Sequence, residues 1–478
     1  MQSPVQQPRP TGRFDALIWM AAALVAYVTF LFVPAVLNDG DTYMHLAAGE
    51  WMARHGAVPH ADPFSYTFAG AHWVAHEWLA EVVMWLAFHF GGWSGLLILF
   101  GGATALTIAL LARHLSRWLD PLPMTLMLVT AGGCMGPSLL ARPHVLALPV
   151  LELWTAGLVM AHTRKRVPWP ILPLMLVWAN LHGSFILGLL LIIPFAFETM
   201  NSAAGEWKVA VRQWALFAVA AVIMASATPQ GLSGLAFPLR LMSMRHLGAI
   251  GEWRVPDFQT VQPIELALMA FIYVCLSRGV RLPLGRLLTL MVLLHLALQH
   301  TRHQMIAGIV GPLILAEPLS LGLSSLRTVA QRPKKTIAWP IAALLAVGAA
   351  LTILRFAFPA SRADGPSSPI SALAHLPADL TATPVLNGYD FGGYLIFKGV
   401  HPFIDARADL YGDDFLGEYE ELMRPDRARL ERTIETRRIN WTILEPHSGA
   451  VGVMDSLQGW HRVYSDDVAV VHARTAIP

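Results

Sequence analysis

Charged residues are scarce in this sequence, and their scarcity excludes an ordinary soluble protein. Asp, Glu, Lys and Arg together make up 14% of the 478 residues, whereas hydrophobic residues make up 55%. A soluble globular domain carries roughly 25% charged residues. A chain this long and this apolar cannot bury its side chains in one aqueous core, so we expect an α-helical polytopic membrane protein.

Cysteine is nearly absent, and so is a strong charge of one sign. The two cysteines, Cys134 and Cys275, lie inside apolar runs and have neither metal-ligand spacing nor the pattern of a disulfide framework. The net charge of +2 gives no sign of a nucleic-acid partner, and none is expected. Low-complexity tracts and short repeats are lacking too, which leaves the apolar runs as the main guide to the fold.

The apolar runs predict about eleven transmembrane helices. The first run, from about Ala16 to Leu37, follows Arg9 and Arg13 and is long enough to span the bilayer. No Ala-x-Ala cleavage site closes it early, so we expect it to remain as the first helix. The runs lie near residues 16–37, 92–112, 121–137, 143–162, 168–183, 184–200, 213–229, 262–277, 285–300, 304–321 and 337–356.

Basic residues fall mainly in alternate loops, which predicts the orientation in the membrane. If the N-terminus is cytoplasmic, the cytoplasmic loops hold Arg113, Arg117, Arg164, Lys165, Arg166, Lys208, Arg212, Arg278, Arg281, Arg286, Arg327, Arg332, Lys334 and Lys335. The opposite loops hold only Arg54, Arg142, Arg240, Arg245, Arg254 and Arg302. By the positive-inside rule we expect a multi-pass protein of the bacterial inner membrane, with residues 1–13 cytoplasmic, a membrane domain at 14–356 and residues 357–478 periplasmic.

The composition changes abruptly after the last predicted span. A linker at 360–369, which contains Pro, Ser and Gly, leads into a charged segment. In that segment short β-like runs near 384–387, 402–406, 441–444 and 468–472 alternate with helical runs near 413–423 and 426–438. This alternation predicts a small periplasmic α/β domain, which has enough residues to bury a core of its own.

The first external loop, predicted at 38–91, brings acidic side chains to the membrane surface. Asp39 and Asp41 directly follow the first span, and Glu77 precedes a further apolar stretch. Carboxylates beside a membrane are expensive to desolvate, so this group favours a functional interpretation. We predict that Asp41, Asp39 and Glu77 are catalytic. They would deprotonate an acceptor hydroxyl or, through Asp41 and Glu77, hold a divalent cation such as Mg²⁺ or Mn²⁺, and no other cofactor is expected.

Structural roles for the same loop remain open. Aspartate is a preferred N-cap, and either Asp39 or Asp41 could cap a helix predicted at 42–55. His45, one turn beyond Asp41, could be a packed histidine rather than a ligand. Asp62, which precedes a proline, is better explained by an Asx-turn than by chemistry.

Several short motifs lie in the external loops and in the tail. They are Gly40-Asp41-Thr42-Tyr43-Met44-His45-Leu46, Pro59 with Asp62-Pro63-Phe64-Ser65-Tyr66-Thr67, His76-Glu77-Trp78-Leu79, Ala141-Arg142-Pro143, Trp178-Ala179-Asn180-Leu181-His182-Gly183, Glu252-Trp253, Gly392-Gly393-Tyr394-Leu395 and Ile404-Asp405-Ala406-Arg407. With the order of spans and loops, they resemble a bacterial branch of the GT-C glycosyltransferases. That superfamily includes oligosaccharyltransferases, protein mannosyltransferases and aminoarabinose transferases.

The resemblance implies a GT-C-like membrane domain in which Asp41 is the catalytic loop acid and Asp39 and Glu77 support it. The tail departs from the oligosaccharyltransferases because it has no Trp-Trp-Asp acceptor motif, so transfer to asparagine is not expected. The implied donor is a polyprenyl-phosphate sugar, which leaves a phosphate at the membrane interface when its glycosidic bond breaks. Developing negative charge there calls for Arg, His or a metal.

The candidate groups for the donor phosphate and substrate lie in the external loops and turns. They are Arg302, Arg142, His300, His303, His45, His76, Asn180, His182 and Glu252. Arginines that reach lipid headgroups, and polar side chains that hydrogen-bond between helices, are the structural alternatives. In the tail, Asp405, Arg407 and Tyr394 are the acceptor-side candidates, and a solvated, ion-paired face is the alternative there.

We therefore expect a glycosyltransferase that moves a sugar to a glycan, lipid or protein acceptor on the periplasmic side, with membrane lipids around it. A polysaccharide polymerase or ligase with the same donor chemistry is an alternative. A non-enzymatic transporter or flippase, or an assembly scaffold for envelope glycan, are the others. Few charges fall inside the predicted spans and no two related halves are visible, which counts against a transporter.

Overall fold

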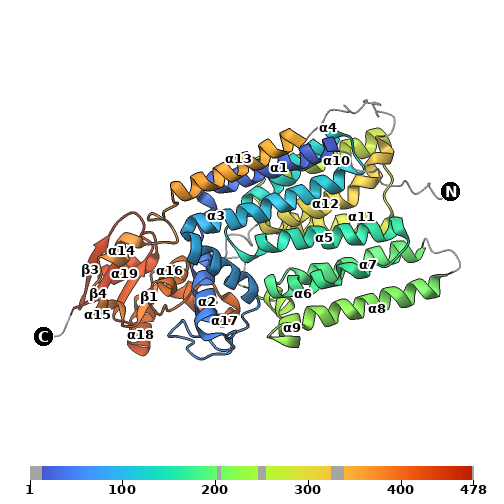
Figure 1. The fold of residues 1–478 in the computed structure, drawn as a ribbon. Coiled ribbons are helices and arrows are strands. Elements are labelled where there is room, and N and C mark those ends of the chain that lie inside the picture. Colours follow the sequence, from blue (N-terminus) through green and yellow to red (C-terminus); the bar gives the residue numbers. More distant parts are fainter. Residues whose placement is uncertain (1–12, 202–205, 246–254, 324–337, 476–478) are drawn as a thin grey trace.

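A long helical bundle with a small mixed domain at one end makes up the computed structural model, which describes residues 13–201, 206–245, 255–323 and 338–475 (Figure 1). The bundle consists of α1 (Arg13–Phe32), α3 (Trp78–Ser116), α4 (Pro121–Met135), α5 (Pro143–Arg164), α6 (Leu172–Leu181), α7 (Phe185–Asn201), α8 (Trp207–Ser226), α10 (Pro263–Arg278), α11 (Leu284–Gln299), α12 (Thr301–Gly322) and α13 (Ala338–Ala357). These helices coincide with the apolar runs that the sequence predicts as spans.

The lengths and surfaces of these helices fit a membrane. Among the described residues, six helices are long and apolar enough to cross a bilayer, namely α1, α3, α5, α8, α12 and α13, and shorter apolar helices lie at 169–181, 185–201 and 284–299. No residue of α13 is buried, and Leu345 and Ile353 on it are exposed. Apolar side chains on the outside of a fully hydrogen-bonded helix fit lipid rather than water. The chain is an α-helical multi-pass membrane protein.

Charged side chains lie inside the bundle, which the sequence analysis did not anticipate. Arg286, which was placed in a cytoplasmic loop, belongs to the first turn of α11, and its side chain is 1% exposed. Its guanidinium lies 3.0 Å from Glu198 of α7 and 2.9 Å from Glu317 of α12. A charge in apolar surroundings persists only when it is paired. The loop placement of Arg286 was therefore wrong, and the residue ties three helices together.

Loss of this arginine should destabilise the bundle. Arg286→Met would leave Glu198 and Glu317 without their counter-charge, and breaking a buried pair costs roughly 3–5 kcal/mol. We expect a clear fall in the midpoint of thermal unfolding, measured on the full-length protein in nanodiscs. Arg281→Met, at an exposed arginine just before α11, is the matched control and should leave the midpoint unchanged. Equal midpoints for the two variants would show that the buried contact adds no stability.

At one end of the bundle, the helix α2 (Gly40–His55) contacts the C-terminal domain (Figure 1). The short helix α16 (Gly392–Phe397) lies against α2, and a Cβ on Gly393 would come within 2.2 Å of the Gly40 carbonyl oxygen. Only glycine permits so close an approach of the two backbones. Below α2, the helix α3 bends at Gly92, whose φ is 55°, so its first turns form a separate segment beside α2.

The C-terminal domain contains a four-stranded sheet in the order β1-β2-β4-β3. β1 (Val385–Asn387) runs parallel to β2 (Trp441–Leu444), and β4 (Val470–Arg474) runs antiparallel to both β2 and β3 (Trp460–Ser465). Its helices, besides α16, are α14 (Ile370–Ala374), α15 (Ala378–Thr381), α17 (Ala408–Leu422), α18 (Arg427–Arg437) and α19 (Gly449–Asp455). The predicted strands near 384–387, 441–444 and 468–472 are confirmed, the strand at 402–406 is wrong, and β3 was missed.

Residues 402–406 bind side chains instead of a neighbouring strand. The Phe403 N–H donates to Asn387 Oδ1 at 2.8 Å, and Asn387 Nδ2 donates to the Ile404 carbonyl at 2.8 Å. Thr67 of the first loop donates its hydroxyl to the Phe403 carbonyl at 2.6 Å. Apolar side chains of this segment share one buried cluster with α2 and the first loop, Met44 and Trp73 among them. The core that was expected to belong to the tail alone is therefore partly shared with the first loop.

Candidate active site

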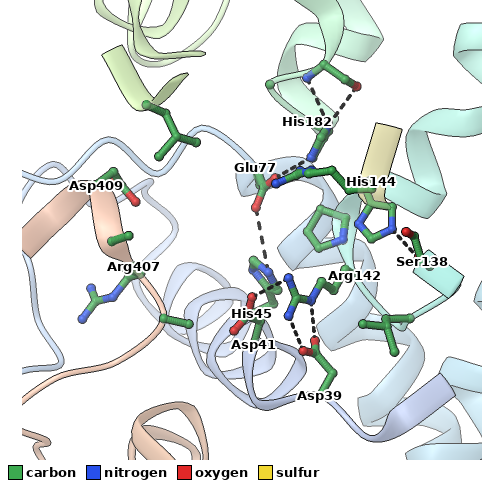
Figure 2. Close-up of a pocket in the computed structure, with 18 of the residues that line it drawn as sticks. Asp39, Asp41, His45, Glu77, Ser138, Arg142, His144, His182, Arg407 and Asp409 are labelled. Carbon is green, nitrogen blue, oxygen red and sulfur yellow. Dashed lines mark hydrogen bonds and ion pairs between the residues drawn. The ribbon is translucent and has the colours of Figure 1, made fainter. Parts of the chain in front are cut away.

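A cavity of about 890 Å³ lies where the bundle, the first loop and the C-terminal domain meet (Figure 2). It is lined by residues from distant parts of the sequence, and the predicted site residues among them are Asp39, Asp41, His45, His76, Glu77, Arg142, His182, Arg302, His303 and Arg407. Concave sites of this size with convergent polar groups are the usual setting for binding and catalysis.

Arg142 links the two aspartates of the first loop (Figure 2). It immediately precedes α5, and its guanidinium donates to Asp39 Oδ2 at 2.8 Å and to Asp39 Oδ1 at 2.5 Å. The remaining nitrogen lies 2.9 Å from Asp41 Oδ2. Bidentate pairing with one carboxylate and a second contact to another fix the plane of the guanidinium. Arg142 is therefore held at the cavity wall by both aspartates.

Asp39, and not Asp41, caps α2. The Thr42 N–H donates to the Asp39 carboxylate at 3.2 Å, and the helix begins at Gly40 rather than at the predicted residue 42. The Asp39 side chain is 5% exposed, whereas the Asp41 side chain is 24% exposed. Capping therefore explains Asp39 and does not explain Asp41. Asp41 is the aspartate of this pair that a molecule in the cavity can reach.

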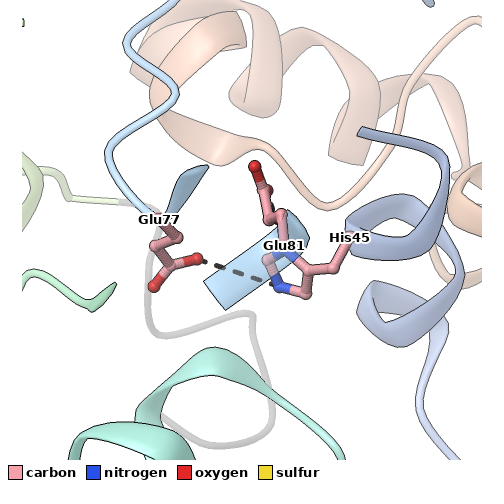
Figure 3. Close-up of side chains that lie close together, drawn as sticks. All are labelled: His45, Glu77 and Glu81. Atoms are coloured by element: carbon pink, nitrogen blue, oxygen red, sulfur yellow. Dashed lines mark hydrogen bonds and ion pairs between the residues drawn. The ribbon is translucent and has the colours of Figure 1, made fainter. Parts of the chain in front are cut away.

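His45, Glu77 and Glu81 form a compact group beside the aspartates (Figure 3). His45 Nδ1 lies 3.0 Å from Glu81 Oε1, and His45 Nε2 lies 3.8 Å from Glu77 Oε2. Burial alone would lower the pKa of His45, but the hydrogen bond to Glu81 and the charges of both glutamates outweigh it and raise the pKa to about 9. With no metal bound, the imidazole is thus a cation between two carboxylates.

The same three side chains fit a divalent cation. One ligand atom from each lies within 4.8 Å of the other two. The second carboxylate oxygen of Glu81 is buried and, among the described residues, has no hydrogen-bond partner. A buried orphan of this kind calls for a missing ligand. One imidazole and two carboxylates suit Mn²⁺ or Zn²⁺ better than Mg²⁺, which prefers oxygen ligands. Asp41, predicted as a ligand, contacts Arg142 and is not part of this group.

Two further histidines surround Glu77. Its Oε1 lies 3.5 Å from His76 Nε2 and 3.4 Å from His182 Nε2. Burial would raise the pKa of Glu77, but His76, His182 and His45 lower it below its ordinary value, so Glu77 is ionised. Burial lowers the pKa of His182 to about 3. The Ser184 N–H donates to His182 Nδ1 at 3.0 Å, so the proton of the neutral ring is on Nε2, which faces Glu77.

The predicted donor-binding residues near α12 are divided between the cavity and its surroundings. Arg302 and His303 belong to the first turn of α12 and line the cavity. A helix N-terminus favours an anion, which adds to the charge of the arginine. The ring of His300, the residue before the helix, lies 5.3 Å from that of His303, but His300 is not part of the lining. Glu252 lies outside the described residues.

Asn180 lies outside the cavity lining and makes hydrogen bonds between helices. Its Oδ1 accepts from Trp78 Nε1 at 2.7 Å, and its Nδ2 donates to the Ala227 carbonyl at 3.2 Å. These contacts join α6 to α3 and to the end of α8. They match the structural alternative that the sequence left open for this residue.

Of the three tail candidates, only Arg407 lines the cavity. Its Nη1 donates to Asp62 of the first loop at 2.6 Å, and its Nη2 donates to Asp405 at 2.7 Å. Asp405 is completely buried, and Tyr394 packs edge-on against Tyr43 with ring centroids 5.2 Å apart. These positions tie the domain to the loop and leave Asp405 and Tyr394 away from the cavity. Asp62 also accepts from the Phe64 and Ser65 N–H groups, so its predicted Asx-turn is confirmed.

Sequence reasoning missed four polar residues of the cavity lining: Glu81, His144, Tyr389 and Asp409. Glu81 follows Glu77 by one helical turn, a spacing that could have indicated it. His144 follows the Arg142-Pro143 pair and lies 2.9 Å from the Ser138 carbonyl oxygen. No local signal marks Tyr389 or Asp409, because only the tertiary fold brings the tail to the cavity.

Comparison with protein-family models gives no match, and comparison with curated proteins gives none either. Solved structures do match. The Archaeoglobus fulgidus oligosaccharyltransferase in its apo form has a TM-score of 0.58 at 11% identity, over 97% of this chain and 74% of that chain. ArnT from Cupriavidus metallidurans, bound to undecaprenyl phosphate, has a TM-score of 0.52 at 12% identity, over 98% of this chain and 99% of that chain. Both are GT-C glycosyltransferases, and the chain studied here therefore has the GT-C fold, as its motifs predict.

Proposed function

We propose that this protein is a membrane glycosyltransferase that moves a sugar from a polyprenyl-phosphate-linked donor to an acceptor bound in the cavity. One observation supports this most strongly: the cavity joins an apolar wall from the bundle to a polar wall of acids, histidines and arginines. A lipid-linked sugar needs both, because its chain is apolar and its reacting carbon carries a phosphate. The GT-C fold, and the undecaprenyl phosphate bound to ArnT, support the same class of donor.

The apolar wall comes from helices that face lipid. Ile186, Leu187 and Leu190 of α7 line it, with Leu293 and Leu296 of α11. Leu190 is 56% exposed, so this wall continues onto the outside of the bundle, where acyl chains lie. A polyprenyl chain that lies along it would bury apolar surface without leaving the bilayer.

The polar wall supplies groups for the phosphate. Arg302 and His303 lie in the first turn of α12, so positive charge and the helix N-terminus act together there. His45, Glu77 and Glu81 would hold a divalent cation, which, when bound, would neutralise charge on the phosphate leaving group.

Asp41 is suited to hold the sugar. It faces the cavity, and its contact with Arg142 fixes its position. An ion pair with arginine makes a carboxylate a weaker base, and its remaining lone pairs can still accept hydrogen bonds from sugar hydroxyls. A single displacement at the sugar carbon would invert its configuration.

We also propose that the cavity faces the periplasm of a bacterial inner membrane. The loops that hold most of the Lys and Arg residues lie at the other end of the helices, in agreement with the positive-inside rule. Glycan, lipid and protein hydroxyls are all available on that side. The same donor chemistry would serve a polysaccharide polymerase or ligase.

Binding of undecaprenyl phosphate tests the donor site. In the full-length protein in nanodiscs, Arg302→Ala should weaken its binding tenfold or more, since a hydrogen bond to a charged group contributes roughly 1.5–3 kcal/mol. Arg302→Lys keeps the charge but loses the planar fork, so it should retain part of the affinity. Arg240→Ala, at an exposed arginine of α9 (Gly231–Met242) outside the cavity lining, is the control. Equal affinities in all of these proteins would count against the role of Arg302.

The transfer itself can be followed without knowledge of the sugar. A lipid extract of the native membranes supplies the lipid-linked sugars, and mass spectrometry would follow their loss and the release of polyprenyl phosphate. We expect the wild-type protein to consume at least one of them. If it binds undecaprenyl phosphate but consumes none, even with native membrane acceptors present, a non-enzymatic role is the better account.

A further inference from the structure

The C-terminal domain contributes its own polar wall to the cavity. Tyr389, Arg407 and Asp409 line it from the tail, opposite the acids and histidines of the first loop (Figure 2). The guanidinium of Arg407 is directed away from the cavity, into its buried contacts with Asp62 and Asp405. Asp409, two residues further along the first turn of α17, carries its carboxylate on the cavity side.

Asp409 differs from the other acids of the cavity in what surrounds it. Asp39 and Asp41 share one arginine, and Glu77 and Glu81 both contact histidine. Within the part of the chain that the structure describes, the carboxylate of Asp409 forms no ion pair. Its lone pairs are thus available to a molecule in the cavity. Burial raises the pKa of Asp409 to about 6, against the opposing charges of His76 and Arg407, which makes it a stronger base than an ordinary carboxylate.

Tyr389 adds a hydroxyl to the same wall. The oxygen atom is buried and, among the described residues, it has no hydrogen-bond partner. A buried phenol normally finds one, so an unpaired hydroxyl on a cavity wall points to a ligand. Tyr389 stands in a short turn, Tyr389–Phe391, that leads into the helix α16 packed on α2. Its position is therefore fixed relative to the first loop.

We propose that Asp409 and Tyr389 form the acceptor subsite, that the acceptor presents a hydroxyl group, and that Asp409 takes the proton of that hydroxyl. This assignment rests on the proposed glycosyl transfer. The acceptor oxygen forms a bond to the sugar carbon as its proton passes to Asp409. The bond from that carbon to the phosphate oxygen breaks, and polyprenyl phosphate leaves with the electron pair. Tyr389 holds the acceptor by a hydrogen bond.

Azide separates loss of a base from loss of structure. It is a nucleophile that has no proton to lose, so it needs no base to attack the sugar carbon. Asp409→Ala should slow the consumption of lipid-linked sugars by roughly 10²- to 10⁴-fold, the range for loss of general base catalysis. Added azide should restore the release of polyprenyl phosphate and yield a glycosyl azide. Tyr389→Phe should raise the acceptor KM roughly tenfold, which corresponds to one hydrogen bond.

Controls keep this result distinct from a failure of the proposed function. Asp414→Ala removes an exposed acid of the same helix and should match the wild type. Asp409→Ala should still bind undecaprenyl phosphate with wild-type affinity. A loss of that affinity, full activity in Asp409→Ala, or a loss of activity that azide does not restore would overturn the role of Asp409. If the wild-type protein neither binds undecaprenyl phosphate nor consumes any lipid-linked sugar, the proposed function fails and this assignment fails with it.

Discussion

Glu81→Gln is expected to abolish high-affinity binding of Mn²⁺, while Asp41→Asn should leave that binding intact. The structure places the ligand atoms of His45, Glu77 and Glu81 within 4.8 Å of one another, and it pairs Asp41 with Arg142 instead. Loss of an outer-shell partner already costs roughly 10- to 100-fold in metal affinity, so the loss of a ligand should cost at least as much. Electron paramagnetic resonance of Mn²⁺ added to the full-length protein would measure both variants.

The pH dependence of this binding has a definite sign. A metal ligand must be deprotonated, and the pKa of His45 in the metal-free group is raised to about 9 by Glu81 and Glu77 against the effect of burial. Affinity for Mn²⁺ should therefore increase between about pH 6 and pH 9, as the competing proton becomes easier to displace. If wild-type protein binds no Mn²⁺ at any pH in this range, protonated His45 is the cation of the group. If Asp41→Asn loses binding and Glu81→Gln keeps it, the ligand set predicted from the sequence is the correct one.

The membrane helices were predictable because their signal is local. Each apolar run carries its own hydropathy and length, and a bilayer permits only helices or closed barrels. Even the bend of α3 at Gly92 coincides with the boundary that the sequence placed between the apolar stretch after Glu77 and the second span. Arg286 escaped the same reasoning because a single charge at the end of an apolar run is usually in a loop. Its partners, Glu198 and Glu317, come from two other helices.

The candidate site was predictable only where its residues share one segment. Asp41, His45 and Glu77 were found because the first loop concentrates polar groups next to the membrane. The contact between Arg142 and Asp41 depends on how α5 meets α2, and no spacing in the sequence encodes that. Asp409 stands in a charged run of the tail that looks solvated until the domain is placed against the loop.

Arg407→Met is expected to release the C-terminal domain from the first loop. The arginine lies 2.6 Å from Asp62 of the loop and 2.7 Å from Asp405 of the tail, and the exposed fractions of the three side chains are 2% for Arg407 and 0% for both aspartates. Its guanidinium also lies 4.8 Å from the ring centroid of Trp73. The substitution leaves two buried carboxylates without a counter-charge, which costs roughly 3–5 kcal/mol. Thermal unfolding and limited proteolysis of the full-length protein in nanodiscs would measure the effect.

An exposed pair in the same domain provides the control. Arg462 lies 2.6 Å from Asp455, with side chains 42% and 40% exposed, so Arg462→Met should cost less than about 1 kcal/mol. Because Asp62 and Arg407 are in direct contact, Asp62→Asn combined with Arg407→Met should destabilise less than the sum of the single changes.

A released domain would also change the cavity, since Asp409 follows Arg407 by two residues on the same turn. Arg407→Met should therefore lower the turnover of lipid-linked sugar, while undecaprenyl phosphate, held by the bundle, still binds. The self-contained domain expected from composition predicts the opposite result. In that case protease sensitivity, unfolding midpoint and turnover would all match those of Arg462→Met, and the tail would be an appendage and not a wall of the active site.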